Sequence, residues 1–514
     1  MPIREPTPSL AAAALELDLR PRESSRAIQS EEAVSGRGEP PHEEATPPGA
    51  GLCGGERQGR LTRGMRIHFI GIGGIGMSGL AAICLDHGCL VSGCDAKLNG
   101  SMRRLQEGGA ATAIGHHPSH LDEALELVVY SAAVSDREPE LLEARSRGIR
   151  TISRGELLAT LAADRRLIAV AGAHGKTTTA GMASQLLVQA GWDPTVVVGG
   201  MMVSFGTNAR SGKGVYLVAE TDESDGSFLR LSPEIAIVTN IDREHLNHYQ
   251  TFEHLVAAFE QFARQLSAGG ALLCCSDNAV VRRVLLHRSQ LCYGFEPGAD
   301  VTAERISLNI QGSSFRARYH GRSVGAFTLH VPGRHNILNA LGALSLGLTL
   351  EIPLGTIRDA LAGFQGTKRR FQVVQLPGDV WFVEDYAHHP AEIRATLDAD
   401  TIRGRHQLVV FQPHRFSRTQ SLEQEFTTCF DRADGVIVTD IYPAFESPIP
   451  GISGERLAHL IKSHGHPCVR YVPKQELRSF VSHIARSGDT IFFLGAGDIG
   501  ELCHDLAKRF HSSV

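Results

Sequence analysis

Short apolar segments alternate with helix-like segments along most of the chain, and glycine-rich turns often separate them. From Met65 onward, residues 77–86 carry the pattern of a helix, and the apolar, β-branched runs around it predict buried strands. The strands predicted for this first block cover residues 66–72, 89–94, 125–131 and 149–153. This alternation is typical of a parallel sheet with helices on both faces.

The same alternation recurs twice. A second block has predicted strands at 167–170, 195–198, 214–220 and 234–240, and predicted helices at 180–189 and 340–350. A third has predicted strands at 380–383, 407–411, 435–439 and 490–494. A chain of 514 residues has room for three domains at roughly 150 residues each. We therefore predict a fold of three consecutive α/β domains, at residues 65–163, 164–368 and 369–514.

The first 64 residues differ from the rest in composition. They contain no Phe, Tyr or Trp but many Pro, Glu and Arg residues. Such a segment cannot bury enough apolar surface to order itself, so we predict a disordered N-terminal extension over residues 1–64. It lacks the apolar core of a secretory signal, and its acidic residues argue against a transit peptide. A simpler expectation is that translation starts at Met65, directly before the first strand.

Composition excludes several classes of partner. With 42% hydrophobic and 21% charged residues and a net charge of −5, the chain is ordinarily globular, and nothing calls for a nucleic-acid partner. No apolar run reaches the ~18 residues of a membrane span, so we expect no membrane insertion. The ten cysteines contain no CxxC pair, which predicts reduced thiols, with neither disulfides nor a zinc site. We therefore expect a cytoplasmic protein.

A first glycine-rich loop follows the strand predicted at 66–72. It contains Gly71, Gly73, Gly74 and Gly76 in a G-x-G-x-x-G pattern, and Asp95 ends the next predicted strand. This spacing predicts a Rossmann-type unit that holds a diphosphate at a helix N-terminus, with the acid facing a ribose or base. A tight turn without a ligand is the structural alternative. The pattern does not identify NAD, because any pyrophosphate suits such a site.

A second loop is more specific. The sequence AGAHGKTTT, residues 171–179, stands between a predicted strand and a predicted helix. Here backbone N–H groups and Lys176 would hold phosphates, and the hydroxyl of Thr177 would bind Mg²⁺. The spacing departs from the usual P-loop, because Val170 takes the place of the first glycine. Two such loops predict two different phosphorylated ligands.

Acidic residues follow two later strands of the second block. Glu220, Asp222, Glu223 and Asp225 end one apolar run, and the segment from Asn240 to His245 ends the next. Beside a phosphate loop, these carboxylates predict Mg²⁺ coordination, although a solvated acidic loop is the alternative. Histidine is an unusual ligand for Mg²⁺, so the residue type alone favours a structural role for His245.

Other candidates lie further along the chain. Asn336 lies in a loop before the helix predicted at 340–350, where its amide suits either an adenine edge or a helix N-cap. His388 and His389 are adjacent and would point apart, and no Cys/Asp cluster completes a zinc sphere, which argues against a metal there. Arg415 and Arg418 suit a carboxylate or phosphate clamp, with a solvated helix face as the alternative.

Together these motifs resemble the Mur ligases, the ATP-dependent amide-forming enzymes of peptidoglycan precursor synthesis. The motifs that carry the resemblance are HFIGIGGIGMSGLA, AGAHGKTTT, AETDESDGSF, TNIDREHLNHY, GRHNILNA, KRRFQ, EDYAHHP, FQPHRFSRT and DIYPAFESPIPG. They span residues 66–500. The family's three α/β domains agree with the three predicted here: a Rossmann-like UDP-binding domain, a P-loop domain and a Rossmann-like C-terminal domain.

The resemblance implies a role for each candidate. UDP-sugar binding is implied for Gly71, Gly73, Gly74, Gly76, Asp95, Ser131, Thr207 and Asn208. ATP binding is implied for Gly172, Ala173, His174, Gly175, Lys176, Thr177, Thr178, Asn336, Arg370 and Asp385. Metal binding is implied for Thr177, Glu220 and His245. Amino-acid binding is implied for Tyr386, His388, Arg415 and Arg418. Lys176, Glu220, His245, His388 and Arg415 are the implied catalytic set.

Within the family, FQPHRFSRT and DIYPA favour the member that joins L-alanine to UDP-N-acetylmuramate with ATP and Mg²⁺, as a monomer or weak homodimer. The alternative is the recycling ligase, which joins a tripeptide to the same UDP-sugar and in which Ala387 is also seen. A nicotinamide-dependent dehydrogenase would leave Lys176 and the acidic cluster without a role. A non-catalytic nucleotide sensor is disfavoured because Lys176, Glu220 and His245 are all present.

Overall fold

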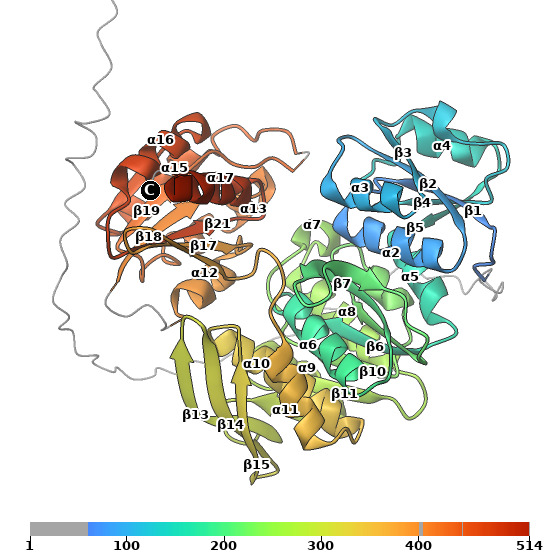
Figure 1. Cartoon of the computed structure of the whole chain (residues 1–514), viewed down its shortest axis with the longest axis horizontal. Helices are drawn as coiled ribbons and strands as arrows, with labels where there is room; N and C mark the ends of the chain where they lie inside the picture. The colour runs from blue at the N-terminus through green and yellow to red at the C-terminus, as the bar shows by residue number, and fades with distance from the viewer. Residues whose placement is uncertain (1–59, 400–404, 445, 513–514) are drawn as a thin grey trace, which may run out of the picture. The chain divides into compact units, whose positions relative to one another are not determined.

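The computed structural model describes residues 60–399, 405–444 and 446–512. Within them lie three sheets of five, ten and six strands, each flanked by helices (Figure 1). The predicted class, three consecutive α/β domains, is confirmed. Of the predicted disordered extension, residues 1–59 lie outside the described residues, whereas Leu61 packs against the core of the first domain.

The first sheet is entirely parallel, in the order β3-β2-β1-β4-β5. Its strands are β1 (Arg66–Ile70), β2 (Leu90–Asp95), β3 (Ala111–Ile114), β4 (Leu127–Tyr130) and β5 (Arg150–Ser153). Its helices are α2 (Ile75–Asp86), α3 (Gly100–Glu107), the short 3₁₀ turn η1 (Pro118–His120), α4 (Pro139–Ser146) and α5 (Arg154–Ala162). Side chains help to fix two helix starts: Asn99 caps α3, and Ser153 with Glu156 forms a capping box on α5.

The central sheet follows the order β15-β14-β13-β12-β11-β10-β6-β9-β7-β8. Its strands are β6 (Arg166–Ala171), β7 (Thr195–Met202), β8 (Thr207–Arg210), β9 (Tyr216–Glu220), β10 (Ile235–Val238), β11 (Ala271–Cys275), β12 (Leu291–Gly294), β13 (Val301–Asn309), β14 (Gly312–Tyr319) and β15 (Arg322–Leu329). Its helices are α6 (Lys176–Gln189), η2 (Ser227–Arg230), α7 (Leu246–Tyr249), α8 (Phe252–Arg264), α9 (Ala279–Val284), η3 (Leu286–Arg288), α10 (Arg334–Thr349) and α11 (Leu354–Gly363).

Strand β6 shows why the predicted strands of this block are apolar at consecutive positions. Leu167, Ala169 and Ala171 join one hydrophobic core, whereas Ile168 and Val170 join another on the opposite face. Successive side chains of a strand point to opposite faces, so a strand buried on both faces must be apolar throughout.

Several elements of the central domain differ from the prediction. Strands β8, β11 and β12 and the antiparallel strands β13, β14 and β15 were not predicted. In the antiparallel strands, irregularities between Glu304 and Ser307 and between Ala317 and Arg318 interrupt the alternation of apolar and polar residues. Helix α10 begins at Arg334, six residues before the start predicted from the apolar run at 340, because the preceding polar residues form its first turns.

The third sheet has the order β16-β17-β21-β18-β19-β20 and is parallel except at its β16 edge. Its strands are β16 (Gln372–Leu376), β17 (Val380–Asp385), β18 (His406–Phe411), β19 (Gly435–Val438), β20 (Val469–Tyr471) and β21 (Asp489–Leu494). Its helices are α12 (Pro390–Leu397), α13 (Phe416–Ser421), α14 (Glu423–Phe426), α15 (Gly454–Ser463), α16 (Lys474–Ile484) and α17 (Ile499–Ser512).

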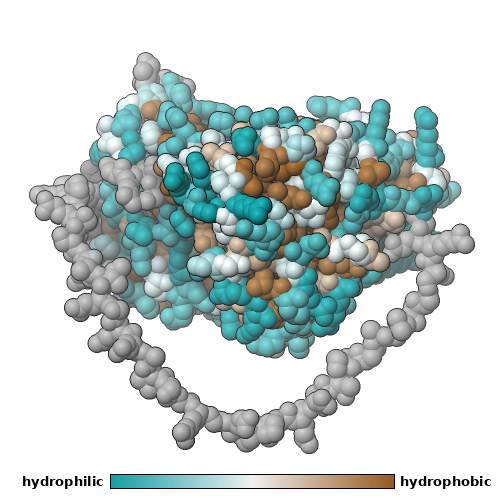
Figure 2. Space-filling view, turned by 90° about the horizontal axis from the view of Figure 1, so that it is seen from below, coloured by the Kyte–Doolittle hydropathy of each residue, from teal (hydrophilic) through white to brown (hydrophobic). Residues whose placement is uncertain are grey.

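The surface is mixed in polarity. On the face shown in Figure 2, hydrophilic residues predominate and hydrophobic ones form patches between them. Among the described residues, no helix combines the length and apolarity needed to cross a bilayer. All nine cysteines in the described part of the chain are free thiols.

Candidate active site

The second glycine loop joins β6 to α6, as the sequence predicts. Gly172 and Gly175 both have positive φ angles, 131° and 80°, and a Cβ at Gly175 would lie 2.5 Å from Asn339 Oδ1. Only glycine fits such positions without strain. The loop therefore aims the N-terminus of α6 at one point, the arrangement that binds phosphate.

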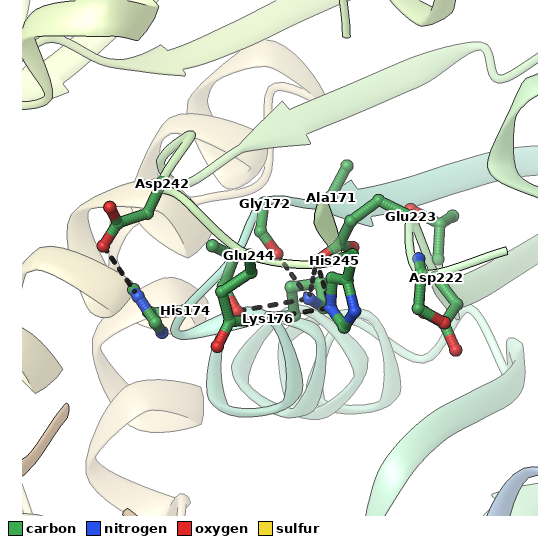
Figure 3. A network of polar contacts seen from close by, with 12 residues as sticks. Ala171, Gly172, His174, Lys176, Asp222, Glu223, Asp242, Glu244 and His245 are labelled. Carbon is green, nitrogen blue, oxygen red and sulfur yellow. Dashed lines mark hydrogen bonds and ion pairs between the residues drawn. The ribbon is translucent and has the colours of Figure 1, made fainter. Parts of the chain in front are cut away.

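Lys176 is the charged centre of this loop (Figure 3). Its Nζ donates to the Gly172 carbonyl and lies 2.8 Å from Glu223 Oε1. Burial alone would lower the pKa of Lys176, but the carboxylates of Glu223, Glu220 and Asp222 outweigh it and raise that pKa. Lys176 is thus a cation held at the mouth of the loop.

The acidic residues after β9 do not form a solvated loop. Burial raises the pKa of Glu223 to about 7 even though Lys176 opposes the shift. Burial would also raise the pKa of Asp222, but the charges of Arg154 and Lys176 lower it to about 2. Glu223 Oε2 is buried and has no hydrogen-bond partner within the described part of the chain, so one carboxylate oxygen of the site is unpaired there.

The three predicted metal ligands fall into two groups. Thr177 Oγ1 donates to Glu220 Oε1 at 3.0 Å. His245 instead lies with Glu223 and Glu244, and the ligand atoms of these three residues are within 4.8 Å of one another. His245 has a φ of 56°, a strained conformation for a residue with a side chain, and burial lowers the pKa of its imidazole. It is therefore an imidazole that favours its neutral form and lies beside carboxylates.

The first glycine loop is held from β2 and α3. The N–H of Gly73 donates to Asp95 Oδ2 at 2.9 Å, and Asn99 Nδ2 donates to the Gly73 carbonyl at 3.1 Å. The predicted Asp95 thus shapes the loop itself. Ser131, at the end of β4, lies against the same loop, where a Cβ on Gly71 would be 3.2 Å from the Ser131 Cβ.

Side chains link the first loop to the central domain. Asn208, on β8, donates from Nδ2 to the Ile75 carbonyl at 2.6 Å, whereas the hydroxyl of its neighbour Thr207 donates to the Ala209 carbonyl at 2.9 Å. Arg154, at the start of α5, donates to Asp222 Oδ2 at 2.7 Å. The two phosphate loops therefore face a shared region.

In the third domain, Arg369 and Arg370 lie over the ring of Tyr386, with guanidinium carbons 4.9 and 5.1 Å from its centroid. Asp385 is buried, and its two oxygens accept the N–H groups of Phe371 and Ala387. Burial raises the pKa of Asp385 to about 6. This carboxyl holds the turn that presents the arginines.

His388 and His389 point to different partners, as adjacent residues on a loop should. His388 Nδ1 lies 2.9 Å from the Tyr386 carbonyl, and the His389 ring lies 4.8 Å from that of His174, centroid to centroid. The sequence indicates no Cys/Asp cluster that would complete a zinc sphere around these histidines, but the structure does bring one Asp close to His389. Asp242 lies with His174 and His389, with ligand atoms within 4.8 Å.

Arg415 and Arg418 come from the start of α13. The Nε of Arg415 is buried and finds no hydrogen-bond partner among the residues that the structure describes, and Arg415 has a φ of 71°. Arg418 Nη1 lies 3.2 Å from His414 Nδ1, and Arg418 Nη2 lies 4.0 Å from Glu244 Oε1. Only 16% of the Arg418 side chain is exposed. A solvated helix face, the alternative for these residues, is therefore wrong for Arg418.

Asn336 is not an N-cap, because Gly333 occupies that position of α10 and Asn336 lies in the first turn. Its Nδ2 donates to the Pro332 carbonyl at 2.6 Å, and its Oδ1 accepts from Asn339 at 3.2 Å. Contact with adenine remains a prediction for this residue.

One cavity of about 790 Å³ joins these elements. Its lining includes residues of both glycine loops and of the third domain, among them Gly76, Lys176, Thr177, Glu220, Arg370 and Tyr386. A space of this size lies within the range of small-molecule binding sites. The cavity therefore brings both glycine loops and a cationic aromatic wall into one compartment.

Models of three protein-family domains match the chain in order. The Mur ligase family catalytic domain matches residues 66–166, the Mur ligase middle domain 170–347, and the Mur ligase glutamate ligase domain 369–497. The chain belongs to the Mur ligase family.

The similarity between this Mur ligase and individual relatives extends over nearly the whole length of those relatives. A UDP-N-acetylmuramate–L-alanine ligase of Sorangium cellulosum is 46% identical over 87% of this chain and 96% of its own. One of Solibacter usitatus is 45% identical over 88% and 96%. The crystal structure of a UDP-N-acetylmuramate-alanine ligase from Thermotoga maritima is 30% identical, with a TM-score of 0.76 over 88% of this chain and 100% of its own. A murein peptide ligase from Psychrobacter arcticus shares the fold, with a TM-score of 0.65 at 22% identity over 88% and 100%.

The structure of this Mur ligase also reveals site residues that sequence reasoning missed. Glu392 lies on α12, and its Oε1 is 3.5 Å from both His174 Nδ1 and Arg370 Nη1. Its Oε2 is 3.3 Å from His388 Nδ1. Its position three residues after His389, in a capping box, was the available signal. Arg154 had no signal in the sequence, because its partner Asp222 is remote in the chain, and the N-cap pattern of Asn99 does not reveal its bond to the Gly73 carbonyl.

Proposed function

We propose that this Mur ligase joins L-alanine to the lactyl carboxylate of UDP-N-acetylmuramate in peptidoglycan precursor synthesis, with hydrolysis of ATP to ADP and phosphate. The single observation that carries the proposal is the shared cavity, which two phosphate loops and the cationic wall of the third domain line together. The named ligases at 45–46% identity support alanine as the amino acid. We place the reaction in the cytoplasm and expect a monomer or weak homodimer.

The first glycine loop is assigned to the UDP diphosphate, with Asp95, Ser131, Thr207 and Asn208 around it. Its backbone N–H groups lie at the N-terminus of α2, which favours an anion. The loop of residues 172–178 is assigned to the ATP phosphates, with Asn336 toward adenine, Arg370 toward the phosphates and Asp385 toward the ribose.

The donor set beside Lys176 fits Mg²⁺. The hydroxyl of Thr177 and the carboxylate of Glu220 are oxygen ligands of the kind that this cation prefers, and the unpartnered Glu223 Oε2 offers another. His245 would contribute beside Glu223 and Glu244. Bound there, Mg²⁺ would neutralise phosphate charge and align the transfer.

The chemistry has two steps. A lactyl carboxylate oxygen attacks the γ-phosphorus of ATP, the bond to the β–γ bridging oxygen breaks, and ADP leaves. Lys176, a buried cation, offsets the charge of the two anions that must meet. The product is an acyl phosphate, which has a good leaving group where the carboxylate had none.

The amine of L-alanine then attacks the acyl carbon, and the tetrahedral intermediate collapses to amide and phosphate. Burial lowers the pKa of His388 to about 4, so its imidazole is neutral near neutral pH. The alanine ammonium group loses its proton to solvent before the attack, and with Nδ1–H donated to the Tyr386 carbonyl, Nε2 can accept a hydrogen bond from the resulting amine and orient it toward the acyl carbon. Arg415 and Arg418 would hold the alanine carboxylate.

The test is phosphate release from ATP in the presence of UDP-N-acetylmuramate and one amino component. L-alanine should support release, and the tripeptide of the recycling ligase should not. Release with the tripeptide alone would assign the recycling reaction instead. Release with neither would leave the protein as a nucleotide sensor.

A further inference from the structure

A second polar cluster lies inside the first domain, away from the reaction. Its centre is the carboxylate of Glu140 on α4, whose side chain is fully buried. Around it stand His68 from β1, Cys94 from β2, and His116 and His120 from the segment after β3. The proposed reaction uses none of these five residues.

The distances within the cluster are short. His68 Nε2 lies 2.9 Å from Glu140 Oε1, and Cys94 Sγ lies 2.8 Å from Glu140 Oε2. His116 Nδ1 lies 3.0 Å from Cys94 Sγ and 3.6 Å from Glu140 Oε2. Zinc bonds of about 2.0–2.3 Å in a tetrahedral site place ligand atoms roughly 3.3–3.6 Å apart. The ligand atoms of His68, Cys94 and Glu140 all lie within 4.8 Å of one another, close to the size of a zinc site, and His116 approaches this group from the Cys94 side.

We propose that His68, Cys94, His116 and Glu140 bind a zinc-class divalent cation at a structural site. Thiolate, imidazole and carboxylate together suit zinc rather than the oxygen-seeking Mg²⁺ of the reaction. Four protein ligands close the coordination sphere, as in structural rather than catalytic sites.

The surroundings of the cluster match those of metal ligands. His68 Nδ1 lies 2.8 Å from Ser92 Oγ, so an N–H donated there leaves the lone pair of Nε2 facing the cluster. His120 Nδ1 lies 3.2 Å from Glu140 Oε1 and would orient the carboxylate. His116 and His120 are each 22% exposed, which gives an ion a route from solvent.

Binding would release one proton. Burial and the neighbouring Glu140 raise the pKa of the Cys94 thiol, so without a cation the sulfur keeps its hydrogen. A cation binds the thiolate form of Cys94, so the thiol proton is released to solvent. Affinity should therefore increase with pH.

The site would also stiffen the UDP-binding loop. The Cys94 carbonyl accepts the N–H groups of Gly71 and Ile72 at 2.8 and 3.0 Å, and Asp95 accepts that of Gly73. An ion fixed to the Cys94 side chain would anchor the strand end on which the loop rests. The prediction of no zinc site rested on cysteine spacing, which cannot register ligands drawn from four separate elements.

The test uses the full chain, stripped with a chelator, dialysed and titrated with Co²⁺ and then Zn²⁺. We expect one ion per chain, a thiolate-to-cobalt charge-transfer band, and displacement of cobalt by zinc. Cys94→Ser should abolish that band, and Ser92→Ala should weaken zinc affinity by roughly 10–100-fold. Cys468→Ser, a partly exposed thiol of the third domain, is the matched control and should change neither.

Three results would overturn the proposal. One is wild-type protein that binds less than a tenth of an equivalent of zinc. Another is a charge-transfer band that survives in Cys94→Ser. The third is zinc binding that His389→Ala abolishes, which would place the ion at the cluster of His174, Asp242 and His389. Near-ultraviolet circular dichroism of Cys94→Ser checks that the variant folds, and Glu140→Gln gives a second test if it does not.

Discussion

His174, in the phosphate loop of the central domain, places its Nδ1 3.5 Å from Oε1 of Glu392, on the first turn of α12 in the third domain. The Glu392 side chain is only 11% exposed, and Arg370 and His388 also lie beside it. One carboxylate thus ties the ATP loop to the residues assigned to phosphate and alanine. Holding reactants in register is a large part of catalysis, so this contact should matter to turnover.

Glu392→Gln should therefore lower kcat/KM. Misplacing positioned groups by about 1 Å lowers rates on the order of 10²-fold, and we expect a fall of about that size. Steady-state phosphate release measures the effect. Glu425→Gln, an exposed glutamate of the same domain, is the control and should stay within about twofold of wild type. A Glu392→Gln enzyme with unchanged kcat/KM would mean that the contact between the domains does not support turnover.

The stability of the ligand-free protein should fall as the pH rises from about 6.5 to 10. Burial alone would lower the pKa of His174, but the Asp242 hydrogen bond and the Glu392 carboxylate raise it to about 10. An unfolded histidine titrates near 6.5, so this stabilisation is complete below pH 6.5 and is lost as the pH rises through 10.

Thermal unfolding at pH 6.5, 8 and 9.5 measures this slope. His174→Asn should flatten it, whereas His287→Asn, at an exposed position, should not. Combining His174→Asn with Glu392→Gln should change stability less than the sum of the single changes, because the two residues share one interaction. Parallel slopes in wild type and His174→Asn would contradict the prediction.

The sequence predicted the fold and the loops better than it predicted the grouping of ligands. A strand buried on both faces, such as β6, leaves a continuous apolar run, and the positive φ angles of Gly172 and Gly175 require glycine. Both signals are local. Glu140 carries no such signal, because its partners lie in other elements and meet only when the chain folds. For Glu392 the capping box was a local signal, but its contacts with His174 and Arg370 arise only in the folded chain. His245 and Glu223 follow different strands, and only folding brings their ligand atoms together with that of Glu244. Strand β13 was not predicted because an irregularity between Glu304 and Ser307 interrupts its alternation of apolar and polar residues.

Lys176→Ala should reduce kcat by about 10³-fold or more, because the charge that faces the transferring phosphoryl group is lost. Binding of UDP-N-acetylmuramate should survive, since the loop from Gly71 to Gly76 is a separate element. Calorimetry with the UDP-sugar and phosphate release separate the two effects. Loss of both together would contradict the assignment of one ligand to each loop.

Removal of residues 2–59 should leave kcat within about twofold of wild type, because no assigned site residue lies there. Removal of residues 2–64 also deletes Leu61, which packs on the first core, and the Gly64 N–H bond to the Gly88 carbonyl. The longer deletion should lower the stability by about 1–2 kcal/mol, with kcat again little changed. Comparing the two truncations by thermal unfolding and turnover separates these contributions. A large fall in kcat with the shorter deletion would show that the extension takes part in function.

Arg415 gives the sharpest test of how the amino acid is held. Its buried Nε has no hydrogen-bond partner among the described residues, and such a guanidinium suits a carboxylate that accepts two parallel hydrogen bonds. Lysine keeps the charge but not the planar fork, so Arg415→Lys should raise KM for L-alanine by roughly 10–100-fold and leave KM for the UDP-sugar nearly unchanged. Arg432→Lys, at a side chain that is 74% exposed in the same domain, is the control and should change neither constant. A rise in KM for the UDP-sugar alone would assign Arg415 to the lactyl carboxylate instead, because the same fork fits either anion and only the substrate whose affinity falls identifies its partner.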